Sequence, residues 1–264
     1  MKVIFFSLVL FLLSNLFNLS YAGNDNYNKR LEFGGSYEYL LPNDTYGSWK
    51  IGRIKFFDKP TPTFNYFLGI DGFSRIEGSA ILFEGGAYKH WNDWFYTYTG
   101  LSGGSNSVYL PKYRADQNFY FAVGPKKNIV LIAGATYIKY FDVHRYEIFS
   151  LGSTYYSDGW NLTYQHFFNI SNPGSVHSSL DLVSLGIGRE GNSWTYFNVS
   201  YGKEAYLATY IATPQEVTHN SLYLEIKRQQ WLGKTWGITT GMSFLKLQEG
   251  YDKYGISFGI FKDF

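Results

Sequence analysis

The chain has 264 residues, of which 21% are aromatic and only 17% are Asp, Glu, Lys or Arg. This composition excludes a disordered tail, a coiled coil and a collagen-like fibre, because each of those classes needs a compositional bias that this chain lacks. Cysteine is absent, which rules out disulfides and Cys-based metal or nucleophilic sites, and a net charge of +2 without a long basic run gives no support to a nucleic-acid partner.

The first 22 residues have the pattern of a secretory signal peptide. Lys2 precedes an apolar run that extends to about Leu19, and Ser20-Tyr21-Ala22 supplies the small-x-small motif of a cleavage site. A transmembrane helix is the alternative, but polar residues interrupt the run and a cleavage site follows directly. We therefore expect a cleaved signal peptide over 1–22, a short periplasmic segment over 23–30 and a single domain over 31–264.

From Leu31 onward, apolar residues recur at every second position, which is the period of a half-buried β-strand. In the last segment Tyr254, Ile256, Phe258 and Ile260 alternate with Gly255, Ser257 and Gly259. The pattern predicts fourteen strands, at 31–41, 45–57, 62–71, 75–88, 93–104, 116–125, 127–141, 145–156, 160–170, 176–188, 193–203, 219–230, 234–247 and 252–263. Three of them, 45–57, 75–88 and 176–188, alternate poorly, which we interpret as β-bulges; a count of twelve stays open.

Alternation alone does not distinguish a soluble sandwich from a membrane barrel. Three features favour the barrel: aromatic residues near the strand ends, polar groups on the opposite face, and a last strand that ends in an aromatic residue, Phe264. The predicted connections also alternate in length, with the longest at 104–115 and 204–218 on one side. The sequence therefore predicts an all-β, antiparallel transmembrane β-barrel of about 12–14 strands in a bacterial outer membrane, with those two loops outside the cell and the turn at Gly191 in the periplasm.

Several short patterns occur in order along nearly the whole predicted domain. They are Trp91-Asn92-Asp93-Trp94 followed by Thr99-Gly100, Tyr137-Ile138-Lys139-Tyr140-Phe141-Asp142, Tyr164 with His166, Gly202 with Ala205-Tyr206, Gly237 with Gly241, and Tyr254-Gly255 leading to Phe264. Together they resemble the YaiO-like outer-membrane β-barrel proteins. The resemblance implies an outer-membrane location, contact with outer-membrane lipid and insertion by the barrel assembly machinery. It implies no catalytic or ligand-binding residue.

In some relatives a similar barrel follows helical-repeat domains of the type found in polysaccharide export proteins, and this implies a link to surface polysaccharide. Residues 23–30 are too few for such a scaffold, so the sequence departs from that arrangement.

Two glycine-containing motifs suggest catalysis or cofactor binding, but each lacks its structural context. Gly100-Leu101-Ser102-Gly103-Gly104 matches the nucleophile elbow of α/β-hydrolases, which needs a strand followed by a helix. Gly186 to Gly191 matches the dinucleotide-binding motif, which needs a βαβ unit. Both are better explained as glycine-rich strand ends, and we predict no cofactor.

The five histidines give one further candidate. Asp142 and His144 are spaced so that both side chains could lie on one face of a strand end. An active site could be assembled only from Ser102, Ser105, Asp142, His144, His177 and His219. Nothing in their spacing selects a set, so we assign no catalytic, cofactor-binding or metal residue.

The alternation also predicts which residues face the interior of the barrel. The polar ones include Glu38, Asn161, Gln165, Glu225 and Lys227, and the bulky ones include Tyr96, Trp194, Tyr196 and Tyr223. We expect the polar groups to pair with each other, Glu225 with Lys227 for example, and the bulky groups to fill much of the cross-section.

The sequence thus predicts a non-enzymatic outer-membrane barrel with a structural, envelope or narrow-channel role and a link to surface polysaccharide. The alternative is a hydrolase that acts on lipid or a surface substrate at the extracellular rim.

Overall fold

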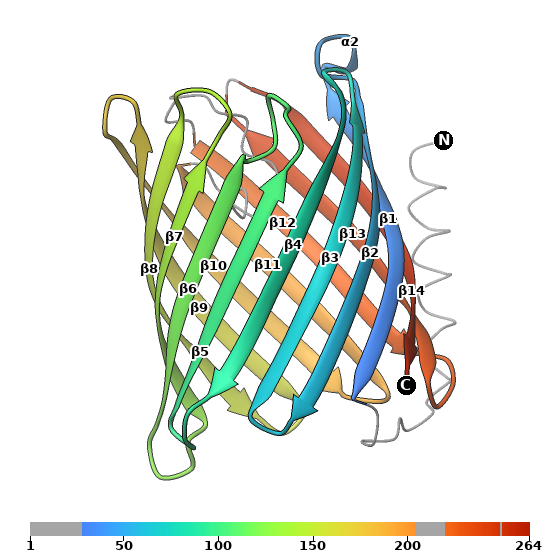
Figure 1. Ribbon diagram of the computed structural model, residues 1–264, viewed down its shortest axis with the longest axis vertical. Coiled ribbons are helices and arrows are strands. Elements are labelled where there is room, and N and C mark those ends of the chain that lie inside the picture. The colour runs from blue at the N-terminus through green and yellow to red at the C-terminus, as the bar shows by residue number, and fades with distance from the viewer. Residues whose placement is uncertain (1–27, 204–219, 249) are drawn as a thin grey trace.

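The computed structural model describes residues 28–203, 220–248 and 250–264, which form one closed barrel of fourteen antiparallel strands (Figure 1). The strands are β1 (Lys29–Leu41), β2 (Ser48–Thr61), β3 (Phe64–Arg75), β4 (Gly78–His90), β5 (Phe95–Gly104), β6 (Tyr113–Val123), β7 (Ile129–Lys139), β8 (Arg145–Ser157), β9 (Trp160–Asn172), β10 (Val176–Arg189), β11 (Ser193–Lys203), β12 (Asn220–Trp231), β13 (Trp236–Leu247) and β14 (Asp252–Asp263). A short helix, α2 (Asn43–Tyr46), lies between β1 and β2. The predicted barrel and its count of fourteen strands are therefore confirmed. The predicted signal peptide lies outside the described residues.

Consecutive strands pair with each other around the ring, and β1 pairs with β14 to close it. Connections at one end of the barrel are short turns, such as 62–63, 158–159 and 190–192, and β1 begins and β14 ends there. We call this end the turn end. The opposite end, which we call the loop end, has the connection 105–112, and β11 ends and β12 begins there. Residues 204–219 between these two strands lie outside the described residues.

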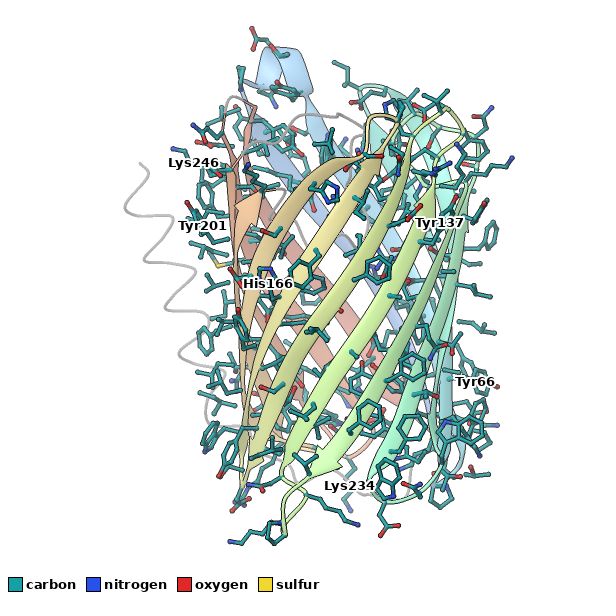
Figure 2. All side chains as sticks on the ribbon, turned by 90° about the vertical axis from the view of Figure 1, so that its left-hand side faces the viewer. Tyr66, Tyr137, His166, Tyr201, Lys234 and Lys246 are labelled. Atoms are coloured by element: carbon teal, nitrogen blue, oxygen red, sulfur yellow. The ribbon has the colours of Figure 1, made fainter. Side chains whose placement is uncertain are left out.

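Side chains alternate between the outer surface and the interior, as the two-residue period of a strand requires. Apolar side chains such as Leu68, Phe83 and Leu224 are exposed on the outer surface. Aromatic side chains surround it near both ends: Trp94, Trp160 and Trp236 near the turn end, and Tyr37, Tyr113 and Tyr254 near the loop end. In Figure 2, Tyr137 and Tyr201 lie toward the loop end and Lys234 lies at the turn end. Such a surface is typical of a barrel in a bilayer. Among the described residues, no helix is long and apolar enough to cross a membrane.

The structure corrects two details of the sequence analysis. β2 continues through Lys59 and Pro60 to Thr61, where a turn was predicted, and its pairing with β3 shifts register between Asp58 and Thr61. The poor alternation of 75–88 and 176–188 is not caused by bulges, because the pairing of β4 with β3 and of β10 with β9 is regular. Those strands carry apolar residues on both faces, and their inward-facing apolar residues include Leu82 and Leu180.

Candidate functional site: the barrel lumen

At the loop end, apolar side chains are buried inside the barrel. Three clusters of buried residues occupy this level: Ile51, Phe73, Ala80, Leu82, Tyr109 and Leu110; Ile138, Tyr140, Tyr146 and Ile148; and Leu40, Trp49, Leu245 and Tyr251. All of these residues are at most 9% exposed. This level of the barrel interior is therefore packed like the core of a soluble protein.

One of these clusters includes a loop that folds into the barrel. Tyr109 and Leu110 belong to the connection 105–112, yet they are 1% and 0% exposed. The Tyr109 hydroxyl donates a hydrogen bond of 2.9 Å to the carbonyl oxygen of Gly78, and Leu110 covers the inward face of Gly104. A side chain larger than hydrogen at Gly104 would collide with Leu110 and with the carbonyl of Pro111, so the glycine makes room for the loop.

Arg75 lies between two aromatic rings at this level. Its guanidinium carbon is 3.7 Å from the ring centroid of Trp49 and 4.1 Å from that of Tyr109, and the residue is only 7% exposed. Its guanidinium nitrogens have no hydrogen-bond partner among the described residues. Glu38 and Lys253 form a buried ion pair of 2.8 Å nearby. Cation–π contacts therefore hold the buried charge of Arg75 and connect the 105–112 loop to the barrel wall.

The middle of the lumen contains ion pairs between neighbouring strands, across one intervening strand and along one strand. Arg53 on β2 contacts Asp71 on β3 at 3.3 Å, and Lys55 contacts Glu84 on β4. On β6, Arg114 and Asp116 form a bidentate pair, and Thr136 donates a hydrogen bond to Asp116. The predicted pairing of interior polar groups is therefore observed, although mostly between residues that the sequence analysis did not name.

The charged side chains are confined to one part of the lumen wall. The register of the pairs shows that no inward-facing residue of β7 to β11 is Asp, Glu, Lys or Arg. These strands present hydroxyl and amide groups instead, which include Thr136, Ser150, Thr154, Asn161, Thr163, Gln165, Asn169, Ser178, Asn198 and Ser200. The lumen thus has two walls. The charged wall is formed by β12, β13 and β14 together with β1 to β6, and the uncharged polar wall is formed by β7 to β11.

Near the turn end, aromatic rings line the lumen. Tyr96 stacks on Tyr120 with centroids 4.5 Å apart and an interplanar angle of 4°, and His90 stacks on the other side of Tyr96 at 4.7 Å. Trp194 and Tyr196 stack at 5.8 Å on β11. We call this set the aromatic lining: His90, Tyr96, Tyr120, Trp194 and Tyr196, together with Tyr88, Tyr98 and Tyr156.

Glycines allow some of these rings to lie against the wall. The Tyr98 ring covers Gly86 and Gly100 on β4 and β5, and Tyr196 lies over Gly186 on β10. A Cβ atom at any of the three glycines would come within 3 Å of the ring that covers it. At these glycines, Tyr98 and Tyr196 therefore lie close to the wall.

Every residue predicted to face the interior does so. Glu38, Asn161, Gln165, Glu225, Lys227, Tyr96, Trp194, Tyr196 and Tyr223 all occupy inward positions in the observed register. One expected pairing differs, because Glu225 accepts a hydrogen bond of 2.7 Å from Asn198 on β11. Tyr223 packs against the apolar cluster that contains Leu245. The sequence analysis missed Arg75, Trp49 and Tyr109, although the phase of the alternation would have placed the first two inside.

Of the candidate serines, histidines and aspartate that the structure describes, Asp142 and His144 are in contact. His144 Nδ1 lies 2.7 Å from Asp142 Oδ2, so those two residues do meet, in the connection between β7 and β8. Burial alone would raise the pKa of Asp142, but hydrogen bonds from His144 outweigh it and hold that pKa below its usual range.

The remaining candidates lie elsewhere. Ser102 faces the lumen on β5, the Ser105 hydroxyl accepts a hydrogen bond from the Ile81 amide, and His177 faces outward on β10; His219 lies outside the described residues. No helix follows the 100–104 motif, and 186–191 is a strand end with a turn. In the part of the chain that the structure describes, no three His, Asp or Glu side chains form a metal-binding group.

An additional polar cluster faces outward. Asp181 Oδ1 accepts a hydrogen bond from the Tyr164 hydroxyl and lies 2.7 Å from His166 Nδ1. Figure 2 shows His166 on the outer surface at a level between Tyr201 and Tyr66, which is within the strand-covered part of the barrel. Pairing between the three groups lowers the cost of placing a carboxylate on a lipid-facing surface.

The comparisons with known proteins agree with this architecture. Residues 28–207 match the family described as the YaiO membrane beta barrel domain. None of the curated proteins searched matches the chain. The toluene transporter TbuX of Ralstonia pickettii has a similar fold, with a TM-score of 0.59, 9% identity, and coverage of 94% of this chain and 92% of TbuX.

Two further structures have the same fold at low sequence identity. A bacterial polysaccharide outer membrane secretin has a TM-score of 0.56, 9% identity, and coverage of 91% of this chain and 100% of its own. The CymD monoaromatic hydrocarbon channel has a TM-score of 0.55, 8% identity, and coverage of 90% and 89%. At such identities the likeness concerns the fold alone. Because the family match covers more than half of the sequence, this chain belongs to the YaiO membrane β-barrel domain family and is an outer-membrane β-barrel protein.

Proposed function

We propose that the barrel is a narrow outer-membrane channel, closed at the loop end at rest, which receives a carbohydrate chain from the periplasm through the turn end. The observation that carries the proposal is the chemistry of the lumen below the apolar level. The aromatic lining lies next to the uncharged wall of β7 to β11, with its hydroxyl and amide groups.

This combination suits a sugar. A pyranose ring presents C–H groups on its faces, which stack on aromatic rings, and hydroxyl groups at its edge, which bond to amides and hydroxyls. Tyr and Trp supply both an apolar face and a polar group in one side chain. Asn161 and Tyr196 meet over Gly186, so that an amide lies beside an aromatic ring on adjacent strands. A row of such pairs can hold successive sugar units without a requirement for charge.

The apolar level at the loop end accounts for the closed state. We expect these almost fully buried side chains to narrow the path for hydrated ions, and an apolar constriction excludes water as well. The loop 105–112 contributes Tyr109 and Leu110 to this closure. It is held by the contact of Tyr109 with Arg75 and by hydrogen bonds to the barrel wall, among them those of Tyr109 with Gly78 and of Ser105 with Ile81. Movement of this loop would widen the lumen without breaking the barrel.

The similar structures support passage through such a barrel, since their descriptions include channels, a transporter and a polysaccharide secretin. The link to surface polysaccharide that the sequence suggested agrees with the lining chemistry. The hydrolase alternative has no comparable support, because the Ser105 hydroxyl accepts a hydrogen bond from the Ile81 amide and Ser102 lies within the β4–β5 pairing, facing the lumen.

Conductance of the purified barrel in a planar bilayer tests the closed state. The unmodified protein should give little steady current. The double variant Tyr109→Ala, Leu110→Ala should give a larger current, because it removes the two loop side chains that fill the apolar level. Val108→Ala is the matched control, since Val108 is in the same loop but 68% exposed. A large, stable current in the unmodified barrel would refute closure.

Carbohydrate binding tests the remainder of the proposal. Maltohexaose should bind to the purified barrel, measured by isothermal titration calorimetry, and Tyr96→Ala with Tyr120→Ala should weaken that binding by about tenfold because the stacked pair is lost. Tyr201→Ala on the outer surface is the control and should change nothing. Equal binding by the lumen variant and the unmodified barrel would count against the aromatic lining as the sugar site.

A further inference from the structure

One segment of the charged wall has a distinctive form. The three strands β13, β14 and β1 lie between β12 and β2 in the ring. Their inward positions in the middle of the barrel carry only small residues: Thr239, Gly241, Ser243, Gly255, Ser257, Gly259, Gly34 and Ser36. The nearest side-chain atoms over Gly241, Gly255 and Gly259 are the hydroxyl oxygens of Ser257, Ser243 and Thr239. This segment is therefore a shallow floor of hydroxyl groups, which we call the hydroxyl floor.

Long basic side chains border the hydroxyl floor on both sides. Lys227 extends from β12, and Arg53 and Lys55 extend from β2. In the observed register all three side chains face inward, from the two strands that flank β13, β14 and β1. Lys227 is exposed within the lumen, and among the described residues it forms no ion pair or hydrogen bond. It is available to a ligand.

The acidic partners of the two β2 residues lie deeper in the wall. The Asp71 side chain is 0% exposed, whereas that of its partner Arg53 is 35% exposed. The contact uses Nε of Arg53, so the two terminal nitrogens of the guanidinium remain for a second acceptor. Glu84 is likewise buried beneath Lys55. The part of the wall that is exposed to the lumen here is therefore basic, although the wall as a whole contains both acidic and basic side chains.

Two inward-facing carboxylates border the hydroxyl floor, and both have other contacts. Glu32 on β1 lies 3.8 Å from Arg30, and Glu225 on β12 accepts a hydrogen bond from Asn198. These two carboxylates reduce the positive potential over the hydroxyl floor, but neither occupies the floor itself. A ligand with a negative charge would add a favourable partner for Lys227 and for the free edge of Arg53, and the floor would supply hydroxyl donors.

We infer that this region is an anion subsite of the lumen, and that the carbohydrate it receives carries carboxylate or phosphate groups. The inference rests on the proposed function and adds the chemical class of the sugar. Lys227 would contact the anion as a compact charge, and Arg53 would hold it with two parallel N–H donors. The uncharged wall opposite would hold the neutral part of the chain.

Calorimetric titration of the purified barrel with hexagalacturonate and with maltohexaose tests the inference. The acidic oligomer should bind more tightly, and added salt should reduce its affinity. Lys227→Gln should lower the affinity for hexagalacturonate about tenfold and leave that for maltohexaose unchanged, because a hydrogen bond to a charged group is lost only with the acidic ligand. Lys227→Arg should keep most of the affinity for hexagalacturonate that Lys227→Gln loses. Lys50→Gln removes the same charge from the outer surface of β2 and is the control.

The possible outcomes separate the two proposals. If maltohexaose binds and the acidic oligomer has no advantage, or if Lys227→Gln weakens both equally, the anion subsite is wrong and the channel proposal stands. If neither oligosaccharide binds, the carbohydrate proposal fails, and the anion subsite as a subsite for acidic sugars fails with it. Inorganic phosphate is titrated in parallel. Binding of phosphate alone, lost in Lys227→Gln, would assign the basic cluster to free anions and overturn the acidic sugar as its ligand.

Discussion

Leu224 offers the sharpest test of which residues face lipid. It lies near the middle of β12 on the outer surface, is 39% exposed, and pairs with Val199 and Phe244, which also face outward. Leu224→Arg would place a charge in the hydrocarbon layer at a cost of about 2–4 kcal/mol. Because about 1.4 kcal/mol corresponds to a factor of ten, the equilibrium constant for unfolding should rise roughly 30- to 700-fold.

The neighbouring strand provides a control that faces the lumen. Asn198 on β11 is directly opposite Glu225 and donates a hydrogen bond to it. Asn198→Arg loses that bond, worth about 1 kcal/mol, but brings a cation to the same carboxylate, so its net effect should stay within about 1 kcal/mol. Tyr223 is a poorer control, because it packs against the apolar cluster at the loop end.

Both variants are measured by urea unfolding of the barrel folded into phospholipid vesicles. A larger destabilisation by Asn198→Arg than by Leu224→Arg would mean that the register of β11 and β12 is shifted by one residue, since such a shift exchanges the two faces. Equal destabilisation would contradict the assignment of Leu224 to lipid and Asn198 to the lumen. The inward assignment of Lys227 would then fail as well.

The remaining predictions concern topology, assembly and pH. Epitope tags inserted at Val108 should be labelled on intact cells and tags at Gly191 should not, because the loop end is expected to face outward; the reverse pattern would invert the barrel. Phe264→Ala should lower the amount of heat-modifiable, folded barrel without a change in synthesis, if the assembly machinery reads the aromatic end of the last strand; unaltered folding would count against that dependence. The hydrogen bonds from His144 depress the pKa of Asp142, so their contribution to stability is present above the unfolded pKa of about 3.9 and is lost as pH falls through the folded value. The difference in unfolding free energy between Asp142→Asn and the unmodified barrel should therefore shrink below about pH 4, and a constant difference would contradict this.

The strands could be predicted because most of them obey the two-residue period. The last strand, for example, alternates from Tyr254 to Ile260, and both its faces were assigned correctly. The end of β2 was missed because Pro60 is typical of a turn, whereas here it lies at the end of a strand beside a register shift, where proline is tolerated.

The apolar level was missed for a different reason. Leu82 and Leu180 face the lumen. In the sequence of a single strand, an apolar residue on the inward face interrupts the alternation of apolar and polar residues. Their packing partners come from distant parts of the chain, such as Tyr109 of a loop for Leu82. The contact of Arg75 with Trp49 and Tyr109 likewise joins three segments, and no local pattern encodes it.

The closure of the ring by β1 and β14 affects how the protein must be made. These strands pair over twelve residue positions, from Arg30 with Asp263 to Leu41 with Asp252, although they stand at opposite ends of the sequence. Until the last strand has been synthesised, the first has an unpaired edge, which is prone to aggregation. Contacts of such high sequence separation also form slowly, since closing a long loop costs entropy before any bond repays it. Truncation before β14 would therefore prevent closure of the whole barrel and would not merely remove one strand.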